Sequence, residues 1–588
     1  QDLTKGKGQL LESDMEEILK RVPPDCQEKF EELSKKYGFG DVEVTCFEMN
    51  TGARLSSTSM SSFEGFLQEQ QRSKRMPKKQ LLLTARPLTA STPGDLKRGP
   101  AQVMTPVTKR TREAVVADLD AGTPAPPPKP THQISVKSSI NTGKLEKIQL
   151  SQTADVKLVG DQWTGGREAY RWMDETLGER AARRDERLQE WEASITSTLH
   201  KQVTEAVIGT VGVPSQVETI LCGRIACEGL EGRLNEHSML LEGSTLAAAK
   251  QVQLNVANCN RVAAIPGQIV GVVGRSGMTG NTFHAKEFLP GLPQEPQPLA
   301  DACQLHALVV AGPFTQKNVL DFTALQTVLV DLAESRDERP EVLIICGPFL
   351  DCNNDKVLSG EVHLQHREEP CSFEEVYAEL FALLFQHLQP LRRASPPTEV
   401  LIIPSLEEVM CFHPLPQPPM DAVMSSYLTQ SDQVEMLQQL GVQFLSNPAH
   451  LEINGIKVSV TSADALAPVL RDLVLRGGGR KMEEALRLLL QQRCLFPMVP
   501  REPAQVCEAR AKALDFPSGT PHLCIFPSIT GLTANVVDDT VFVNPGFLCR
   551  SAGPGSFAEL WIAPGPAGDS TSLKDRVRVD VKKLEKNS

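Results

Sequence analysis

The sequence of 588 residues lacks any apolar run of the roughly 18 residues that a membrane-spanning helix needs. Its first residues, QDLTKGKGQLLESD, contain no apolar core of the kind found in signal peptides. Its 14 cysteines are scattered without a single CxxC pair, which argues against zinc sites and favours reduced, buried thiols. We therefore expect an intracellular protein that folds without disulfides or structural zinc.

Charge is present in the usual amount but is unevenly distributed. The formal net charge is -12, which argues against a protein that binds nucleic acid over its whole surface. Residues 72–112 are the exception, because they hold eleven Lys or Arg and one acidic residue, Asp95. A chain of this length is too long to fold around a single hydrophobic core, so roughly three or four domains are expected.

The N-terminal region, residues 1–70, is predicted to be a small helical docking module. Apolar residues recur at helical spacing in QLLESDMEEILKRV, and a second helix is expected between a cap at Asp25 and Gly38. A third helix is expected around SSFEGFLQEQQ. Because such a bundle has few core residues, we expect it to dock onto other proteins rather than to carry chemistry.

Residues 71–157 are predicted to be a disordered, basic tether, because Ser, Thr, Pro and basic residues dominate over apolar ones. The KRMPKK stretch is a candidate nuclear-import signal, and the alternative is a solvated charge run. Three Thr-Pro pairs are candidate phosphorylation sites, where a phosphate would add negative charge to a positive arm. The import candidates are Lys74, Arg75, Lys78 and Lys79, and the phosphorylation candidates are Thr92, Thr105 and Thr123.

Two ordered segments are expected after the tether. Residues 158–205 are predicted to hold a long, charged bracing helix around GREAYRWMDETLGERAARRDERLQEWEASI. Residues 206–300 contain short apolar stretches separated by turn residues, which is typical of an OB-type β-barrel. The stretches are 217–227, 237–243, 250–256, 265–277 and 281–288.

An OB-type barrel raises the hypothesis of single-stranded DNA binding, since such barrels stack bases on aromatic side chains in a basic groove. This one offers Phe283 and Phe288, and its charges balance at six basic against six acidic residues between positions 216 and 290. The stretch GRSGMTGNT has the glycine pattern of a phosphate-binding loop but lacks the lysine that such a loop requires. A protein-binding barrel is therefore favoured over a DNA-binding one.

Residues 301–588 alternate between buried strands and amphipathic helices, which predicts an α/β domain with chemistry at the carboxyl ends of its strands. A helix at SFEEVYAELFALLFQHL is opened by a capping box of Ser372 and Glu375. Strands are expected at HALVVAG, EVLIICG, EVLIIPS, IKVSVTS, PHLCIFP, DTVFVNP and SFAELWIA. A two-metal phosphoesterase would carry Asp, His and Asn ligands directly after such strands.

Those ligands are missing from the expected strand ends. The first three strands are followed by Gly-Pro, Gly-Pro and Pro-Ser, Asp351 is the one carboxylate left, and His363 and His366 are expected in a solvated loop. We therefore predict no catalytic residue, no metal ligand and no cofactor. The positions of a vestigial metal site are Gly312, Pro313, Gly347, Pro348, Asp351, Pro404 and Ser405.

The order of these segments resembles the B subunits of eukaryotic replicative DNA polymerases, and most of all that of DNA polymerase alpha-primase. The stretches that carry the resemblance are SSFEGFL, MTPVTKR, LLEG, IPGQIV, VVAGPFT, IICGPFLD, LIIPSLEEV, HPLPQPP, EINGIKVSVTSAD, LLQQRCLFPMVP and VFVNPGFL. The resemblance implies a multidomain α+β protein. Its expected parts are a helical N-terminal module, a tether, an OB fold and an inactivated calcineurin-like phosphoesterase sandwich at 301–588.

The resemblance also implies a function without catalysis. It implies an accessory subunit that binds the C-terminal region of the polymerase catalytic subunit and links it to the two primase subunits for initiation of DNA replication in the nucleus. The N-terminal module is implied to recruit other replication or telomere factors, with little direct DNA binding and no membrane association. A metal-dependent phosphodiesterase and a single-stranded DNA-binding OB protein are the alternatives.

Overall fold

The structure is a computed structural model, and it describes only part of the second of two compact units, 1–122 and 123–588. The predicted helical module at 1–70 and most of the predicted tether therefore lie outside the described residues. The described residues are 132–141, 145, 153–160, 175–229, 233–292, 299–300, 303–335, 339–364, 367, 369–410, 413–421, 432–499, 506–517, 519–550, 553–565 and 572–586.

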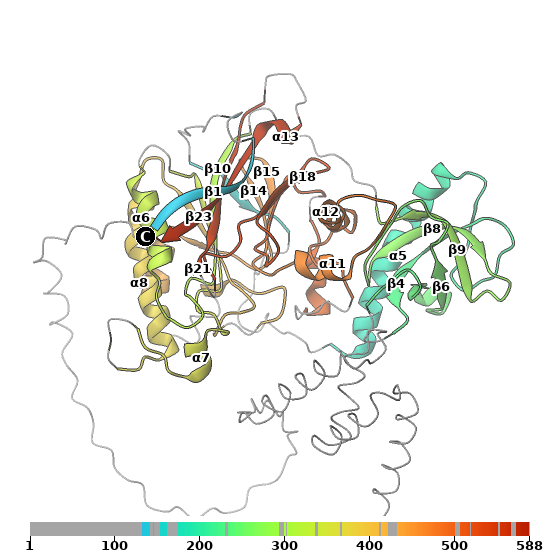
Figure 1. Ribbon diagram of the computed structural model, residues 1–588, viewed down its shortest axis with the longest axis horizontal. Helices are drawn as coiled ribbons and strands as arrows, with labels where there is room; N and C mark the ends of the chain where they lie inside the picture. The colour runs from blue at the N-terminus through green and yellow to red at the C-terminus, as the bar shows by residue number, and fades with distance from the viewer. Residues whose placement is uncertain are drawn as a thin grey trace, which may run out of the picture. The chain divides into compact units, whose positions relative to one another are not determined.

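Helix α5 (Leu177–Gln202) lies in the range predicted for the bracing helix. It begins with a capping box, because Thr176 accepts a hydrogen bond from the backbone N–H of Glu179 and the Glu179 carboxylate accepts one from Thr176. Apolar residues recur on one face of the helix and pack against two strands of the following domain (Figure 1). The buried members are Leu188, Trp191, Ile195 and Leu199.

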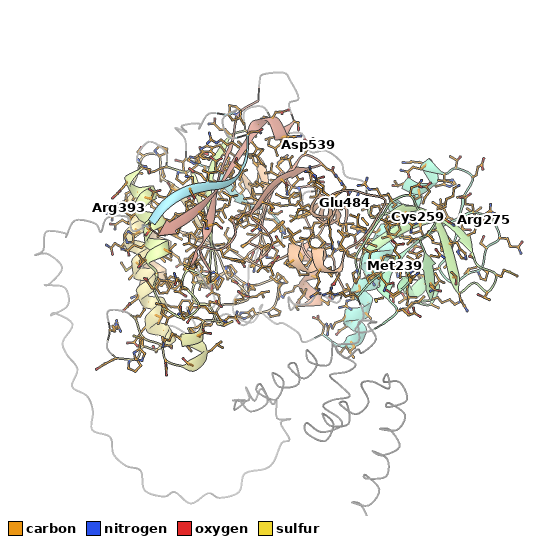
Figure 2. The ribbon with its side chains drawn as sticks, in the orientation of Figure 1. Met239, Cys259, Arg275, Arg393, Glu484 and Asp539 are labelled. Atoms are coloured by element: carbon orange, nitrogen blue, oxygen red, sulfur yellow. The ribbon has the colours of Figure 1, made fainter. Side chains whose placement is uncertain are left out.

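The next domain is a curled sheet with strand order β3-β4-β5-β6-β9-β8, in which β8 also pairs with β4. The first four stretches predicted from the sequence each contain one of its strands, and the fifth contains all of β9 except its last residue, whereas the short β3 was not predicted. Met239, at the start of β5, is fully buried in its core, and Arg275 on β8 is exposed (Figure 2). The strands are β3 (Val207–Ile208), β4 (Thr219–Cys227), β5 (Met239–Glu242), β6 (Gln251–Asn255), β8 (Ile269–Ser276) and β9 (Thr282–Leu289).

The C-terminal domain contains two large sheets. The first has the order β1-β23-β22-β10-β11-β12-β13, with β10 to β13 parallel to one another. Its strands are β1 (His132–Ile140), β10 (Leu305–Ala311), β11 (Val342–Cys346), β12 (Glu399–Ile403), β13 (Gln443–Phe444), β22 (Ser556–Ile562) and β23 (Val577–Lys586).

The second sheet has the order β18-β19-β17-β15-β14-β2. One apolar cluster contains side chains of both sheets, so the two sheets share a core. Alternate residues of β10 show this division, because Val309 belongs to the shared core while Val310 belongs to a second cluster. The strands are β2 (Val156–Leu158), β14 (Ala449–Ile453), β15 (Ile456–Val460), β17 (Leu523–Ile525), β18 (Thr533–Val537) and β19 (Thr540–Asn544).

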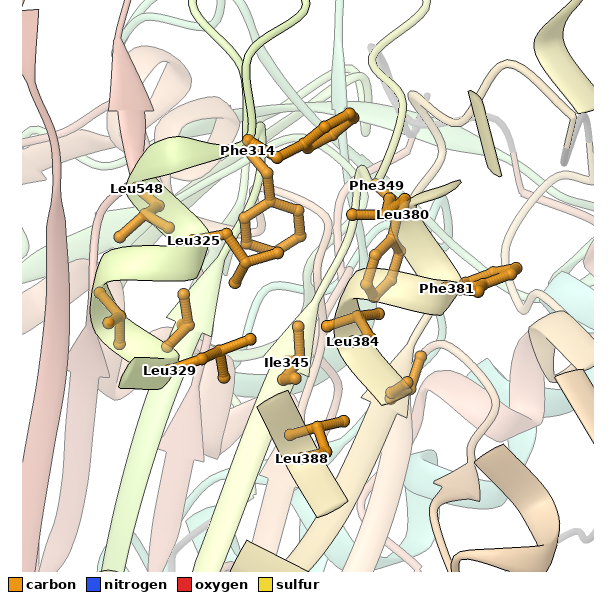
Figure 3. Close-up of a cluster of buried hydrophobic side chains, with 14 of the residues drawn as sticks. Phe314, Leu325, Leu329, Ile345, Phe349, Leu380, Phe381, Leu384, Leu388 and Leu548 are labelled. Carbon is orange, nitrogen blue, oxygen red and sulfur yellow. The ribbon is translucent and has the colours of Figure 1, made fainter. Parts of the chain in front are cut away.

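Two long helices cover the other face of the first sheet, α6 (Thr323–Glu334) and α8 (Phe373–Arg392). Leu329 of α6 and Leu384 and Leu388 of α8 lie around Ile345 of β11 and belong to the second cluster (Figure 3). The capping box of Ser372 and Glu375 that the sequence predicts is present at the start of α8. Shorter helices are α7 (Asp355–Ser359), α10 (Asp432–Gln439), α11 (Leu466–Asp472), α12 (Lys481–Gln491), α13 (Leu573–Arg576) and the 3-10 helix η4 (Glu508–Leu514).

Strands β1 and β2 correct the prediction that residues 71–157 form one disordered tether. β1 pairs antiparallel with β23, and β2 pairs with β14, so each becomes the edge strand of one large sheet. The Asn141 amide fastens the end of β1 by donating to the carbonyls of Lys574 and Val577. Composition favoured disorder here because the strand partners lie hundreds of residues away, where local sequence carries no sign of them.

A buried glutamine joins the curled sheet to the C-terminal domain. The Gln492 side chain, just beyond α12, accepts from the backbone N–H of Ile269 and donates to the carbonyls of Ile269 and Pro290. Strand β7 (Val262–Ala264) also pairs with β16 (Val474–Arg476), one strand coming from each domain. The backbone of the two domains is therefore connected by direct hydrogen bonds.

Candidate functional site

The strand ends of β10, β11 and β12 meet at one edge of the first sheet. The parallel register aligns Ala311 with Cys346 and Cys346 with Ile403, so the residues that follow each strand lie side by side. Two backbone hydrogen bonds extend the alignment by one residue, from Gly312 N to Cys346 O and from Gly347 N to Ile403 O, each 2.8 Å long. The sheet therefore brings together the loops that hold all seven positions predicted for a vestigial site.

The two glycines of these loops have close neighbours. A Cβ atom at Gly312 would lie 2.1 Å from the carbonyl oxygen of Pro348, and one at Gly347 would lie 2.3 Å from a carboxylate oxygen of Glu408. Real Cβ contacts are never this short, so the loops can approach only because both residues are glycine. Pro313 and Pro348 follow them and offer no side-chain ligand, as the sequence predicts.

Glu408 lies at the centre of the strand ends, although nothing in the sequence distinguishes it from its neighbour Glu407. Its side chain is buried and accepts hydrogen bonds from the backbone N–H groups of Phe349 and Leu350 and from the hydroxyl of Tyr377, at 2.7, 3.3 and 2.7 Å. Burial raises the pKa of Glu408 to about 7, and the three hydrogen bonds oppose that rise. The carboxylate therefore ties together the loop after β11, the loop after β12 and helix α8.

Asp351 forms a local turn at this edge. Its carboxylate accepts a hydrogen bond from the backbone N–H of Asn353 at 2.8 Å, which is an Asx turn. Burial raises the pKa of Asp351 and also that of Glu407, and for Glu407 the negative charges of Asp351 and Asp464 contribute further. Asp464 itself accepts from four donors, namely the backbone N–H groups of Leu466, Ala467 and Ile529 and the hydroxyl of Ser528.

Neutral polar side chains fill the rest of the edge. The amide of Gln417 donates to the carbonyl of Ser405 and accepts from Asn447, at 3.0 and 2.8 Å. Asn447 also bonds to the hydroxyls of Thr461 and Ser462, and Ser462 donates to the carbonyl of Pro404. Pro404 and Ser405 are thus held through their backbones, and this buried network links the two sheets.

The metal-ligating residue types do not gather in the described part of the chain. No group of three or more His, Cys, Asp or Glu side chains in the described ranges could hold a metal ion. His522 precedes β17, and its Nδ1 accepts a hydrogen bond from the backbone N–H of Lys457. His366 lies outside the described residues, so the prediction about the pair with His363 remains a prediction.

The two aromatic residues available for DNA stacking in the curled sheet face inward. Phe283 is buried in the core, and Phe288 is half-buried and packs against that core. Base stacking needs an exposed aromatic face. Within the described part of this domain, neither ring is placed to stack a base.

The remaining predicted sites lie outside the described residues. These are the import candidates Lys74, Arg75, Lys78 and Lys79 and the phosphorylation candidates Thr92, Thr105 and Thr123. In the described ranges, no helix is both long enough and apolar enough to cross a membrane.

Two family models match the chain at the domains described above. The model for the OB domain of the DNA polymerase alpha B subunit matches residues 184–291, and the model for the DNA polymerase alpha/epsilon B subunit matches residues 307–532. Over these two domains the chain is therefore similar to the B subunits of DNA polymerases alpha and epsilon. The OB domain and the resemblance inferred from the sequence motifs are both confirmed.

The chain is also similar to curated proteins that are named as B subunits of DNA polymerase alpha. A protein of Schizosaccharomyces pombe, named as the B subunit of DNA polymerase alpha, is 29% identical over 383 residues, which are 61% of this chain and 62% of that protein. The protein of the same name from Rattus norvegicus is 28% identical over 382 residues, 62% of this chain and 58% of that protein. The chain thus spans about three fifths of the length of these relatives.

Proposed function

We propose that this chain is a non-catalytic accessory and regulatory subunit of DNA polymerase alpha-primase. It binds the C-terminal region of the catalytic subunit and connects it, indirectly, to the two primase subunits for initiation of DNA replication. The likeness to proteins named as B subunits of DNA polymerase alpha supports this function. The nucleus is the expected compartment, because such a polymerase acts on chromosomal DNA.

The strand ends supply the observation that most supports a scaffold role. In a two-metal phosphoesterase, carboxylate and imidazole groups at such strand ends hold ions that clamp the attacking and leaving oxygens. Here the carboxylate of Glu408 accepts from Phe349, Leu350 and Tyr377, and that of Asp464 accepts from four donors. The edge is therefore built to hold its own loops together. We propose that the two large sheets are the sandwich of an inactivated phosphoesterase-like domain.

The OB domain is proposed to bind protein rather than single-stranded DNA. Its inward-facing Phe283 and Phe288 support protein binding over single-stranded DNA binding. The N-terminal module is proposed to recruit other replication or telomere factors, and phosphorylation of the Thr-Pro pairs in the tether is proposed to regulate that recruitment.

Reconstitution with the polymerase tests this proposal. The full chain is co-expressed with the C-terminal region of a DNA polymerase alpha catalytic subunit, and a complex of one copy each is expected in affinity purification. A full chain that stays monodisperse and fails to capture that region would overturn the proposal. Two metal ions per chain in elemental analysis, with nuclease activity lost in Asp351→Ala, would instead support the phosphodiesterase alternative.

A further inference from the structure

A cavity of about 730 Å³ lies between α5, the OB domain and the C-terminal domain. Its walls come from α5, from β4 and the turn that follows it, and from residues near α11 and before position 500 of the C-terminal domain. It shares no lining residue with the strand-end site described above. A volume of this size can hold several side chains of a bound segment.

Four arginines line this cavity, and two of them make two-pronged contacts with carboxylates. Arg184 donates through Nε and Nη2 to the carboxylate of Glu508, at 3.1 and 2.7 Å. Arg471 makes the same kind of two-pronged contact with Asp472, at 3.0 and 2.8 Å. The other two are Arg224 and Arg233.

Arg224 is a buried cation with too few acceptors. Its side chain is 12% exposed, one Nη donates to the backbone carbonyl of Arg184, and the carboxylate of Glu242 lies 3.7 Å from the other. A guanidinium carries five N–H donors, so most of those of Arg224 have no acceptor among the described residues. Burial lowers the pKa of Arg224, and the negative charges of Glu242 and Asp185 oppose this effect while the positive charges of Arg184 and Arg187 add to it. An added anion at this point would be stabilised.

Arg233 lines the same cavity and is exposed. Within the described ranges it makes no ion pair. A carboxylate that enters the cavity would gain two guanidinium partners, and guanidinium donors match a carboxylate in a two-pronged geometry.

The lining residues distinguish between protein and nucleic acid as the ligand. None of them is aromatic, so bases would find no ring on which to stack. Asp185, Glu242 and Asp472 also line the cavity and would repel a continuous run of phosphates, whereas a peptide can space its charges. Apolar lining comes from Leu234 and Met498, which are largely buried in the cores of the two domains.

We propose that this cavity binds an acidic, extended segment of a partner protein and that Arg224 and Arg233 receive one of its carboxylates. This inference goes beyond the proposed function, because it does not depend on which protein carries the segment.

Fluorescence anisotropy with the full chain tests this site. The probe is a fluorescein-labelled peptide of alternating glutamate and leucine, compared with the same peptide carrying glutamine for glutamate and with an oligo(dT) of equal net charge. We expect the acidic peptide to bind, with an affinity that falls as salt rises, and the glutamine peptide to bind far more weakly. Equal binding of the two peptides, tighter binding of oligo(dT), or no binding of the acidic peptide would each overturn the proposal.

Three variants assign the binding to the two arginines. Arg233→Gln removes an exposed charge without disturbing the core and should weaken peptide binding about tenfold to a hundredfold, the range expected for one charged hydrogen-bonded pair. Arg224→Lys keeps the charge but loses the planar guanidinium, and it should also weaken binding. Arg275→Gln is the matched control on the exposed side of β8 and should leave affinity unchanged (Figure 2). Equal affinity in Arg233→Gln and Arg275→Gln would refute the assignment.

Discussion

Glu408→Gln is the substitution that tests the strand-end arrangement most closely. Burial raises the pKa of Glu408 from 4.5 to about 7, so the folded protein binds this proton more tightly than the unfolded chain does. Stability therefore falls as pH rises from about 4.5 to about 7. One pKa unit corresponds to about 1.4 kcal/mol, so this one group lowers the free energy of unfolding by about 3 kcal/mol over that range.

The glutamine side chain cannot lose a proton, so the free energy of unfolding of the variant should not fall in this way as pH rises. At pH 5 the wild-type side chain is protonated, so its O–H, like the amide NH₂ of glutamine, donates rather than accepts. We therefore expect the two proteins to differ little in stability at pH 5. By pH 8 its stability relative to the wild type should have risen by about 2 to 3 kcal/mol.

Urea denaturation at several pH values between 5 and 8 measures this difference. Glu341, whose pKa is also raised to about 7 by burial, is present in both proteins and cancels in the comparison. Glu374→Gln, which removes an exposed carboxylate from the first turn of α8, is the matched control and should show no such rise. A wild-type-to-variant difference that stays constant from pH 5 to 8 would show that Glu408 does not titrate as a buried, raised carboxyl group.

Three further predictions concern the fold. Gly347→Ala places a methyl group against the Glu408 carboxylate and should lower the free energy of unfolding by about 1 to 3 kcal/mol. Gly531→Ala, where a Cβ would meet no atom within 4 Å, should cost far less in the same urea titration. Gln492→Ala leaves the buried backbone N–H and carbonyl of Ile269 without their side-chain partner, while the carbonyl of Pro290 keeps the amide of Gln268. It should cost about 2 to 4 kcal/mol, with faster hydrogen exchange at the amide of Ile269. A chain that begins at 142 should exchange the amides of β23 faster than one that begins at 132, and equal rates would contradict the pairing of β1.

Local patterns in the sequence predicted many of the regular elements. The capping box at Ser372 and the buried runs of β10, β11 and β12 depend on neighbouring residues, and the structure has them as predicted. β1 and β2 were missed because an edge strand with polar residues is specified by a distant partner. For the same reason, the pairing of β7 with β16 across two domains left no local signal.

The candidate site, too, has features that the sequence predicted and features that it did not. The prolines directly after Gly312 and Gly347 could be read from the sequence, because the position after a strand is fixed by the strand itself. The central position of Glu408 could not be predicted from the sequence, because it depends on Tyr377, which lies 31 positions earlier in the chain, on α8. Likewise, Asn447 and Gln417 look like ordinary loop residues until the fold brings them to the same edge.

The scaffold function is tested most directly by size-exclusion chromatography with light scattering on the full chain mixed with the C-terminal region of a DNA polymerase alpha catalytic subunit. We expect a single stable complex of one copy of each, formed equally well by wild type and by Asp351→Ala, because Asp351 serves a local turn. Two separate peaks, with no complex at micromolar concentrations of a folded chain, would contradict a scaffold function.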